Sequence, residues 1–277
     1  MIDMHLHSLC SDGEKTVSEL ILKLLNSGVK YASLTDHDTI CGSDSFENEC
    51  KKVGINTVPG VELEAFYDKE KLNYLHLLCY DYNNKKTLKT FLEEEREKRI
   101  LAINKYVNYF RKNGYAISFD DIQKEMIGNH ILINHLCAVL EKKNIFKTKY
   151  DAYKFLLSND TFSSFNYPRY TMEEIMILIK EIDGKSVLAH PNRLRMGNND
   201  KETIIKKLVD YGLMGIESYY FMDNYNEMLF SNYIAQKYNL IETVGSDWHY
   251  ENENINFGNK NITSYKEKIL RKEFFHE

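Results

Sequence analysis

Strand-like and helix-like patterns of apolar residues alternate along most of this chain. Short strand-like runs occur at 1–6, 31–35, 56–63, 75–80, 185–190, 213–219 and 240–246. Segments with the 3.6-residue period of an amphipathic helix lie at about 16–26, 43–52, 86–112, 172–182, 200–210 and 224–238. Gly28 and Gly54 follow the first two helical segments, as helix C-caps commonly do. Because strands and helices alternate, we expect an α/β protein built on a parallel sheet.

The alternation is interrupted once, after Gly114. Residues 115–168 contain short helical pieces and no strong strand-like run, and Pro168 ends this stretch. We therefore predict a barrel domain made of 1–95 and 169–277, with a small helical insertion, or lid, at 96–168. About seven strand-like runs favour a TIM-like barrel of the (β/α) type, whose functional site lies at the carboxyl ends of its strands.

The composition limits the kinds of molecule that this protein is expected to bind. The 277 residues are 43% hydrophobic and 28% charged, as is usual for globular proteins, and the formal net charge is −5. Without a basic excess, tight binding to long duplex nucleic acid is not expected, and no apolar run reaches the ~20 residues that span a bilayer. The five cysteines lack C-x-x-C spacing, and the chain has no apolar leader. We therefore predict a reduced, cytoplasmic protein with no membrane association and no obligate protein partner.

Histidines and carboxylates gather where the predicted strands end. His5 and His7 lie two apart in the first strand-like run, so both side chains project from one face. His37, Glu62 and His190 each end or follow a later run. These side chains are usual ligands of Zn, Mn and Fe ions, and the carboxyl ends of barrel strands meet at one face. The pattern therefore indicates a metal site built from distant parts of the sequence.

Each of these residues also has an ordinary structural interpretation. A histidine pair separated by one residue can be exposed or hydrogen-bonded to backbone, and His190 can simply close a strand. Asp247 and His249 repeat the two-residue spacing after the last strand-like run, and Asp12 follows the first pair. A carboxylate such as Glu62 is costly to bury without a cation, so the combination favours metal binding.

Taken in order, the motifs resemble those of the polymerase and histidinol phosphatase (PHP) family. They are Asp-x-His-x-His, Ser-Asp-Gly, Thr-Asp-His, Gly-Val-Glu, Ala-His-Pro and Ser-Asp-x-His. The resemblance covers nearly the whole chain outside the insertion, and it implies a distorted (β/α)7 TIM-like barrel with three divalent ions, Mn, Fe or Zn. The insertion is similar to that of the subgroup of 3′,5′-nucleoside bisphosphate phosphatases and 5′-to-3′ exoribonucleases acting on short RNA.

The resemblance also implies a ligand set. It assigns one ion to His5, His7, Glu62 and Asp247, a second to Glu62, His76 and His190, and a third to Asp12, His37 and His249. The implied reaction is hydrolysis of a phosphomonoester, or of a terminal phosphodiester, of a nucleotide or short 5′-phosphorylated RNA by a metal-bridging hydroxide. Three dications, three carboxylates and one hydroxide leave a charge of about +2, which suits a phosphate dianion.

Residues that bind substrate are marked less clearly. His135 falls where the subgroup shows an Arg-Pro-His stretch, but Ile-Asn precedes it here, so that arginine is missing. We assign His135 to catalysis or substrate binding on the resemblance; alone, a histidine on the apolar face of a helix would be a core residue. Arg169 and Arg193 are predicted to bind phosphate, against the alternative of surface salt bridges. Asp247 is a candidate proton acceptor as well as a ligand.

Three other functions fit parts of the pattern. The same chemistry could act on a small monoester such as histidinol phosphate or phosphoserine. A metal-dependent amidohydrolase also has a strand-end His-x-His, but that class uses a bridging lysine on a middle strand, and none stands out here. The remaining alternative is a non-catalytic, regulatory metal-binding module, against which the complete ligand set argues.

Overall fold

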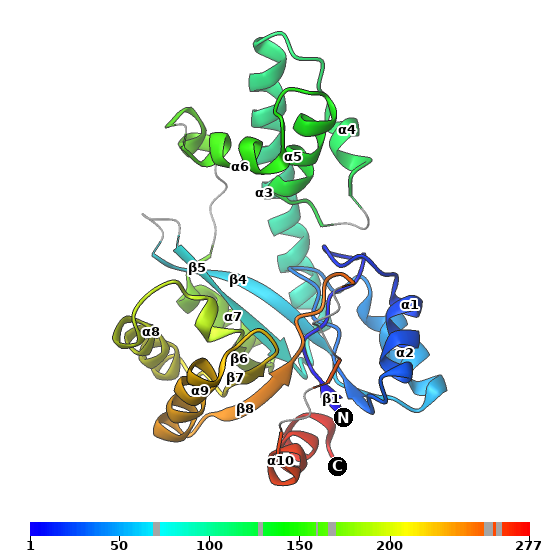
Figure 1. Cartoon of the computed structure of the whole chain (residues 1–277), viewed down its shortest axis with the longest axis vertical. Coiled ribbons are helices and arrows are strands. Elements are labelled where there is room, and N and C mark those ends of the chain that lie inside the picture. Colours follow the sequence, from blue (N-terminus) through cyan, green and yellow to red (C-terminus); the bar gives the residue numbers. More distant parts are fainter. Residues whose placement is uncertain (69–72, 127–129, 159, 166–169, 252–256, 259–261) are drawn as a thin grey trace. The chain divides into compact units, whose positions relative to one another are not determined.

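The computed structural model describes residues 1–68, 73–126, 130–158, 160–165, 170–251, 257–258 and 262–277. The chain divides into two compact units (Figure 1). Met1–Leu88 with Arg169–Glu277 form the first unit, and Lys89–Pro168 form the second. The predicted boundaries of the barrel and insertion, and the role of the insertion as a lid, stay predictions.

The first unit contains two sheets (Figure 1). A parallel sheet has the order β1 (Ile2–Asp3), β2 (Tyr31–Ala32), β3 (Asn56–Thr57). A second sheet has the order β4 (Gly60–Asp68), β5 (Asn73–Tyr80), β6 (Lys185–Leu188), β7 (Gly215–Tyr220), β8 (Ile241–Gly245). β5 runs antiparallel to both of its neighbours, whereas β6, β7 and β8 are parallel.

This arrangement confirms the α/β class and corrects the expected sheet. We expected parallel strands closing into one barrel, but within the described residues the strands form two sheets, one of them mixed. β4 and β5 are too close in sequence for the helical crossover that parallel neighbours need, so they pair antiparallel. Backbone hydrogen bonds and isolated bridges connect the sheets at both edges. The Met4 N–H donates to Val244 O at 3.0 Å, and His37 forms an isolated bridge with Glu62.

Except for the last one, the described helices of the first unit lie in the predicted segments. They are α1 (Val17–Asn26), α2 (Ser43–Val53), α7 (Met172–Glu181), α8 (Asn198–Asp210), α9 (Tyr225–Tyr238) and α10 (Ser264–Phe275). α1 begins with a reciprocal capping box between Thr16 and Glu19, and Gly54 ends α2 at φ 76°. In Figure 1, α7, α8 and α9 lie on the five-stranded sheet, and α1 and α2 lie beside the three-stranded one.

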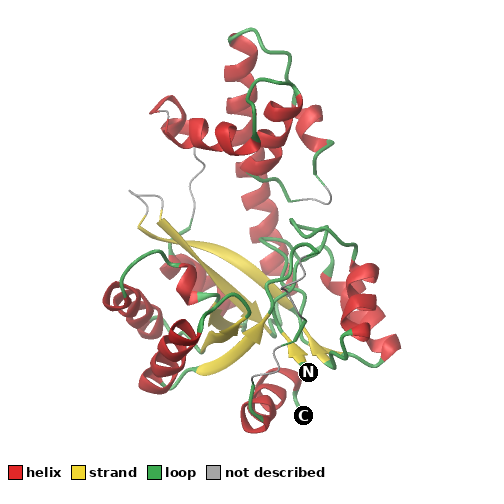
Figure 2. Ribbon diagram, viewed as in Figure 1, coloured by secondary structure: helices red, strands yellow, loops and turns green. Residues whose placement is uncertain are grey.

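The described residues of the second unit form helices joined by loops and turns, with no strand among them (Figure 2). α3 (Lys85–Lys112) starts in the first unit and continues into the second, where α4 (Phe119–Gln123), α5 (Ile133–Lys142), α6 (Lys149–Ser158) and a 3-10 helix (Asp160–Phe165) follow. Their apolar faces form a separate core that includes Phe110, Leu136 and Phe162. The short helical pieces predicted for this stretch are confirmed.

Two of the apolar clusters buried in the described part of the first unit stabilise its sheets. One gathers side chains from both sheets and from α10, among them Met4, Tyr80 and Phe274. The other packs α1 and α2 against the three-stranded sheet, with Leu20 and Phe46 at its centre. Burial of these faces fixes the strands and so sets where each strand ends. No helix in the described part of the chain is long and apolar enough to cross a membrane.

Candidate metal centre

All nine residues predicted to bind metal lie in the first unit, and the fold brings them together. They come from the chain after β1 (His5, His7, Asp12), after β2 (His37), within β4 (Glu62) and β5 (His76), after β6 (His190) and after β8 (Asp247, His249). Ligand atoms lie within 4.8 Å of one another in three overlapping groups: His7, Asp12, His37 and His249; His5, His7, Glu62 and Asp247; and His37, Glu62 and His76.

Glu62 is the centre of the cluster and is fully buried. Its Oε1 lies 2.8 Å from His76 Nδ1 and 3.0 Å from His190 Nε2. Its Oε2 lies 3.2 Å from the Nε2 atoms of both His5 and His7. A carboxylate with ligand nitrogens beside both oxygens suits a bridging position between two cations.

Several polar atoms of the cluster are buried without a hydrogen-bond partner. They are His5 Nε2, both ring nitrogens of His7, Glu62 Oε2 and Asp247 Oδ1. Asp247 Oδ1 lies 3.3 Å from His5 Nε2 and 3.1 Å from His7 Nε2, but without hydrogen-bond geometry. Leaving such an atom unsatisfied costs about 1–3 kcal/mol. Converging lone pairs on four buried side chains are the donor set that a divalent cation needs.

A second part of the cluster surrounds Asp12. His249 Nε2 lies 3.4 Å from Asp12 Oδ1, and His37 Nε2 lies 3.9 Å from Oδ2. The His7 ring stacks against both histidines, with centroids 4.1 Å from His249 and 4.5 Å from His37. The Asp12 side chain is 30% exposed, so this end of the cluster can be reached from solvent.

The loop that carries Asp12 is held by Asp36, which is itself buried. Asp36 Oδ1 accepts the Ser8 N–H at 2.7 Å and the Ser11 hydroxyl at 2.6 Å. Its Oδ2 accepts the Ser8 hydroxyl at 2.7 Å. These three hydrogen bonds fix the backbone between the first histidine pair and Asp12.

Opposite charges hold the cluster ionised. Burial by itself raises carboxyl pKa values, but the surrounding histidines hold the pKa of Asp12, Glu62 and Asp247 below the usual range. Burial by itself lowers histidine pKa values. It prevails at His190, but the carboxylates outweigh it at His5, whose pKa is raised well above its usual value, and at His37, whose pKa is raised to about 10. The carboxylates are therefore negative at neutral pH and demand positive charge, which protons on the histidines or metal ions can supply.

Two of the candidate ligands have left-handed backbone two residues after a strand ends. His190 has φ 26° and ψ 62°, and Asp247 has φ 51°. Such conformations cost non-glycine residues on the order of 1–3 kcal/mol and cluster at functional sites. Here the turns bring His190 against Glu62 and Asp247 against His5.

Arg193, predicted to bind phosphate, lies beside the cluster. Its Nη1 donates to Asp247 Oδ2 at 2.9 Å while its side chain stays 56% exposed. The Tyr220 hydroxyl donates to the same oxygen at 3.2 Å. Arg193 therefore reaches both a candidate ligand and the solvent.

The other two predicted substrate residues are not placed in this cluster. His135 belongs to the second unit, at the start of α5, where its Nδ1 accepts the Leu132 N–H at 3.0 Å. Arg169 lies outside the described residues. Their contact with substrate stays a prediction.

Two buried carboxylates beside the cluster were not predicted to act there. Glu217, in β7, lies 3.1 Å through Oε1 from His5 Nδ1. Asp3 accepts the N–H groups of Ser246 at 3.0 Å and Gly258 at 2.9 Å, which ties β1 to the chain after β8, and burial raises its pKa to about 6. The signal that could have found Glu217 is the one that marked Glu62, a carboxylate inside an apolar strand.

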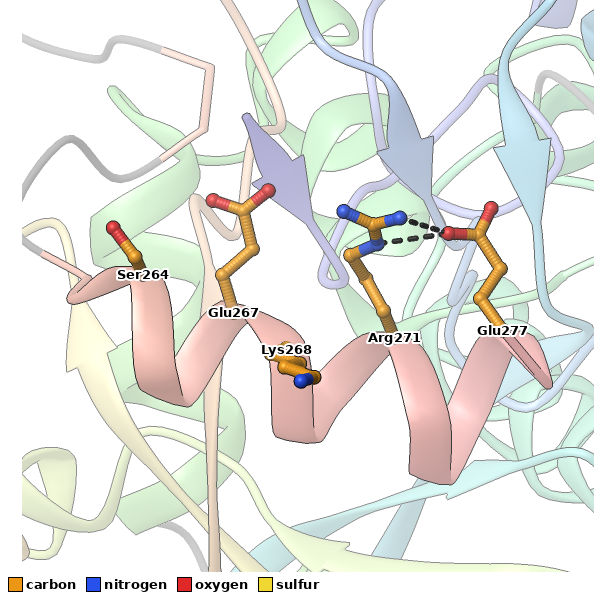
Figure 3. A pocket seen from close by; sticks show the side chains of 5 residues that line it. All are labelled: Ser264, Glu267, Lys268, Arg271 and Glu277. Carbon is orange, nitrogen blue, oxygen red and sulfur yellow. Dashed lines mark hydrogen bonds and ion pairs between the residues drawn. The ribbon is translucent and has the colours of Figure 1, made fainter.

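A surface pocket of about 460 Å³ lies elsewhere, along α10 (Figure 3). It is lined by Ser264, Glu267, Lys268, Arg271 and Glu277. Arg271 Nε donates to Glu277, which also accepts from Tyr31 and Asn56 at the amino ends of β2 and β3. The pocket is thus at the strand ends opposite the histidines, and two of its charged side chains, Arg271 and Glu277, pair with each other.

Comparison with known proteins identifies the family. A family model described as the PHP domain matches residues 3–211. The chain belongs to the PHP domain family. The resemblance predicted from the motifs is therefore confirmed, and the two sheets with their buried strand-end histidines are an α/β fold of PHP type.

This PHP domain protein is similar over most of its length to bacterial enzymes. It is 25% identical to a phosphoribosyl 1,2-cyclic phosphate 1,2-diphosphodiesterase of Eggerthella lenta, over 89% of this chain and 93% of the relative. It is 25% identical to a 5′-3′ exoribonuclease of Haemophilus influenzae, over 90% and 89%. It is 26% identical to a 3′,5′-nucleoside bisphosphate phosphatase of Chromobacterium violaceum, over 91% and 88%.

A solved structure shares the fold of this chain. It is described as an amidohydrolase from Chromobacterium violaceum with bound sulfate, and it matches with a TM-score of 0.78 at 23% identity, covering 98% of this chain and 96% of that one. The chain is thus a PHP-family phosphoesterase related to nucleotide phosphatases and exoribonucleases, with buried His, Asp and Glu clusters suited to metal.

Proposed function

We propose that the chain hydrolyses a phosphate ester carried on ribose, in a nucleotide or a short 5′-phosphorylated RNA, with three divalent ions at the nine-residue cluster. The names of the three relatives above all describe enzymes that act on a phosphate ester of ribose. The observation that carries the metal dependence is the set of five buried ligand atoms without hydrogen-bond partners around Glu62.

The side chains fall into three sets in this proposal. They are His5, His7, Glu62 and Asp247; Glu62, His76 and His190; and Asp12, His37 and His249. Bound Mn, Fe or Zn ions would supply a nucleophile from water at neutral pH and offset the negative charge of the phosphate. The partly exposed Asp12 set would be the end at which substrate arrives.

The protein's own groups would orient the substrate and shape the site. Asp247 serves first as a ligand, because a carboxylate whose pKa is held this low is a weak proton acceptor. Arg193 uses one of its five N–H donors on Asp247, which leaves others for the phosphate oxygens. His135 would contact the rest of the substrate, as the subgroup resemblance implies, and Arg169 would bind phosphate.

A chromatographic assay tests the proposal. Mn-loaded protein would be incubated with adenosine 3′,5′-bisphosphate, a 5′-phosphorylated RNA trimer, a ribose 1,2-cyclic phosphate, phosphoserine and histidinol phosphate, with His190→Ala as the blank. We expect AMP from the bisphosphate and mononucleotides from the trimer, with no product in the blank.

Other outcomes of this assay separate the alternatives. Release of phosphate only from phosphoserine or histidinol phosphate would keep the chemistry and reject ribose as the carrier. Product only from the cyclic phosphate would support a ribose phosphate as the substrate and would contradict a nucleotide or RNA substrate. Inactivity on all five substrates with metals bound would favour a regulatory metal module or an amidohydrolase.

A further inference from the structure

We propose that Glu217 is a positioning residue that sets the tautomer of His5 and fixes the turn that carries His190. The proposal rests on the proposed metal-dependent function, because it assigns both histidines to the metal cluster. Glu217 lies in the middle of β7 and is fully buried. A buried carboxylate is costly unless its oxygens are paired, so its partners show what it does.

Each oxygen of Glu217 meets a different part of the cluster. Oε1 lies 3.1 Å from His5 Nδ1, and Oε2 accepts the backbone N–H of His190 at 2.8 Å. An ionised carboxylate can only accept hydrogen bonds, so the contact requires a hydrogen on His5 Nδ1. In the neutral ring the lone pair is then on Nε2, the atom that faces the cluster.

The other ring nitrogen of His5, Nε2, faces the cluster. His5 Nε2 is buried without a hydrogen-bond partner, 3.2 Å from Glu62 Oε2 and 3.3 Å from Asp247 Oδ1. This position of Nε2, between two carboxylates and without a hydrogen-bond partner, suits a cation shared by the three side chains. A carboxylate behind a ligating histidine also makes the ring a better ligand.

Gly245 provides a separate observation that this contact is built into the fold. A Cβ on Gly245 would lie 2.2 Å from the His5 Cβ and 2.4 Å from Glu217 Oε1. Only a residue without a side chain lets the end of β8 pass this close to both. The glycine at position 245 therefore leaves the space in which His5 and Glu217 make contact.

The second oxygen extends the effect to another candidate ligand. His190 has a left-handed backbone, and its N–H is held by Glu217 Oε2. His5 lies beside Oε2 of Glu62, and His190 lies beside Oε1. One carboxylate in β7 therefore positions histidines on both sides of the bridging carboxylate. Glu217 itself is not a ligand here, because both of its oxygens are directed at protein donors behind the cluster.

Two measurements on the whole chain test the proposal. ¹⁵N-histidine spectra of the metal-free protein, assigned with His5→Gln, report which ring nitrogen of His5 carries hydrogen. Titration calorimetry with Mn²⁺ reports affinity. We expect an Nδ1–H His5 in the wild type, and about 10–100-fold weaker Mn²⁺ binding in Glu217→Gln. The amide keeps the volume but cannot accept at both positions.

Matched variants separate positioning from general damage. Glu242→Gln removes a largely buried carboxylate of the neighbouring strand β8, which pairs with Lys266 and should leave Mn²⁺ affinity unchanged. Gly245→Ala should weaken Mn²⁺ binding from the opposite side of the same contact. If Glu217→Gln does not fold, the Mn²⁺ affinity of Gly245→Ala and the position of hydrogen on wild-type His5 still test the proposal.

The proposal is overturned if Nδ1 of wild-type His5 carries no hydrogen, or if Glu217→Gln binds Mn²⁺ as the wild type does. Neither measurement uses a substrate, so both results remain informative even if the chain hydrolyses no phosphoester. If the wild type bound no divalent ion, the proposed function would fail, while the tautomer would still test the contact between Glu217 and His5.

Discussion

Arg193 and Asp247 are paired at the edge of the candidate metal centre. Arg193 Nη1 donates to Asp247 Oδ2 at 2.9 Å, while Oδ1 of the same carboxylate faces the Nε2 atoms of His5 and His7. Arg193 ends the short turn after β6, and more than half of its side chain is exposed. The guanidinium thus connects a buried candidate ligand with the solvent from which a phosphate would arrive.

Replacing Arg193 with Gln should weaken substrate binding more than it slows the bound complex. A hydrogen bond between charged groups contributes about 1.5–3 kcal/mol, or roughly a 10–100-fold rise in KM. Steady-state kinetics on adenosine 3′,5′-bisphosphate would measure it, with metal content checked by mass spectrometry. Arg195→Gln, at an exposed arginine two residues on, is the control. Loss of metal without a change in KM would instead make Arg193 a structural partner of Asp247.

Asp36→Asn should disturb the Asp12 end of the cluster. The amide can replace one acceptor oxygen, but its NH₂ group then faces donors on Ser8 or Ser11. A buried unsatisfied donor costs about 1–3 kcal/mol, so the free energy of unfolding should fall by about that amount. Urea denaturation measures this loss, and metal analysis should show fewer ions per chain. Asp44→Asn, at an exposed carboxylate, should change neither, and an unchanged metal content in Asp36→Asn would contradict the role of the loop.

The sequence predicts the cluster well because its signals are local. His5 and His7 share a strand face, and Glu62 is a carboxylate at the end of an apolar run, so each can be recognised without knowing the fold. Glu217 gives the same local signal, but its partner His5 is 212 positions away. Only the pairing of β7 with its neighbours shows that the two side chains meet.

The sheet was predicted less well because strand direction and ladder length are not local. The run at 31–35 has strand character, but the β2 ladder includes only Tyr31 and Ala32. Beyond them the Thr35 N–H still donates to Leu6 O, but the Leu6 N–H donates to the Thr35 hydroxyl, so a side chain interrupts the regular ladder. Periodicity also gives no direction, which is why the antiparallel β5 was expected to be parallel.

The metal-free protein should lose stability as the pH rises above neutrality. The pKa of His37 is raised from 6.5 to about 10 in the folded chain, chiefly by the carboxylates of Glu62 and Asp12 against the opposing effect of burial. A histidine whose pKa is higher in the folded than in the unfolded chain stabilises the fold fully at a pH below the unfolded-state pKa. This stabilisation is lost as the pH rises to the folded-state pKa. The window is therefore pH 6.5 to 10, and His37 alone would account for up to about 5 kcal/mol.

Chemical denaturation in EDTA at pH 6.5, 8 and 9.5 would measure this loss. With saturating Mn²⁺ the additional stabilisation by metal should grow over the same range, because the ion binds only deprotonated histidine. A metal-free profile that stays flat would show that the histidines are not held protonated by Glu62 and Asp12.

Phe162→Ala should destabilise the second unit and leave the metal centre intact. Phe162 is 1% exposed, and the rings of Tyr109, Tyr106 and Phe165 lie around it at centroid distances of 4.8, 5.2 and 5.4 Å. Removing such a ring from a packed core costs about 3–5 kcal/mol. Hydrogen-exchange mass spectrometry should show faster exchange within Lys89–Pro168, with Mn²⁺ content unchanged. Phe46→Ala, in the core beneath α1 and α2, should show the reverse, with metal lost and the helical unit protected. If Phe162→Ala also releases the metal, then the two units do not unfold separately and the helical insertion supports the site itself.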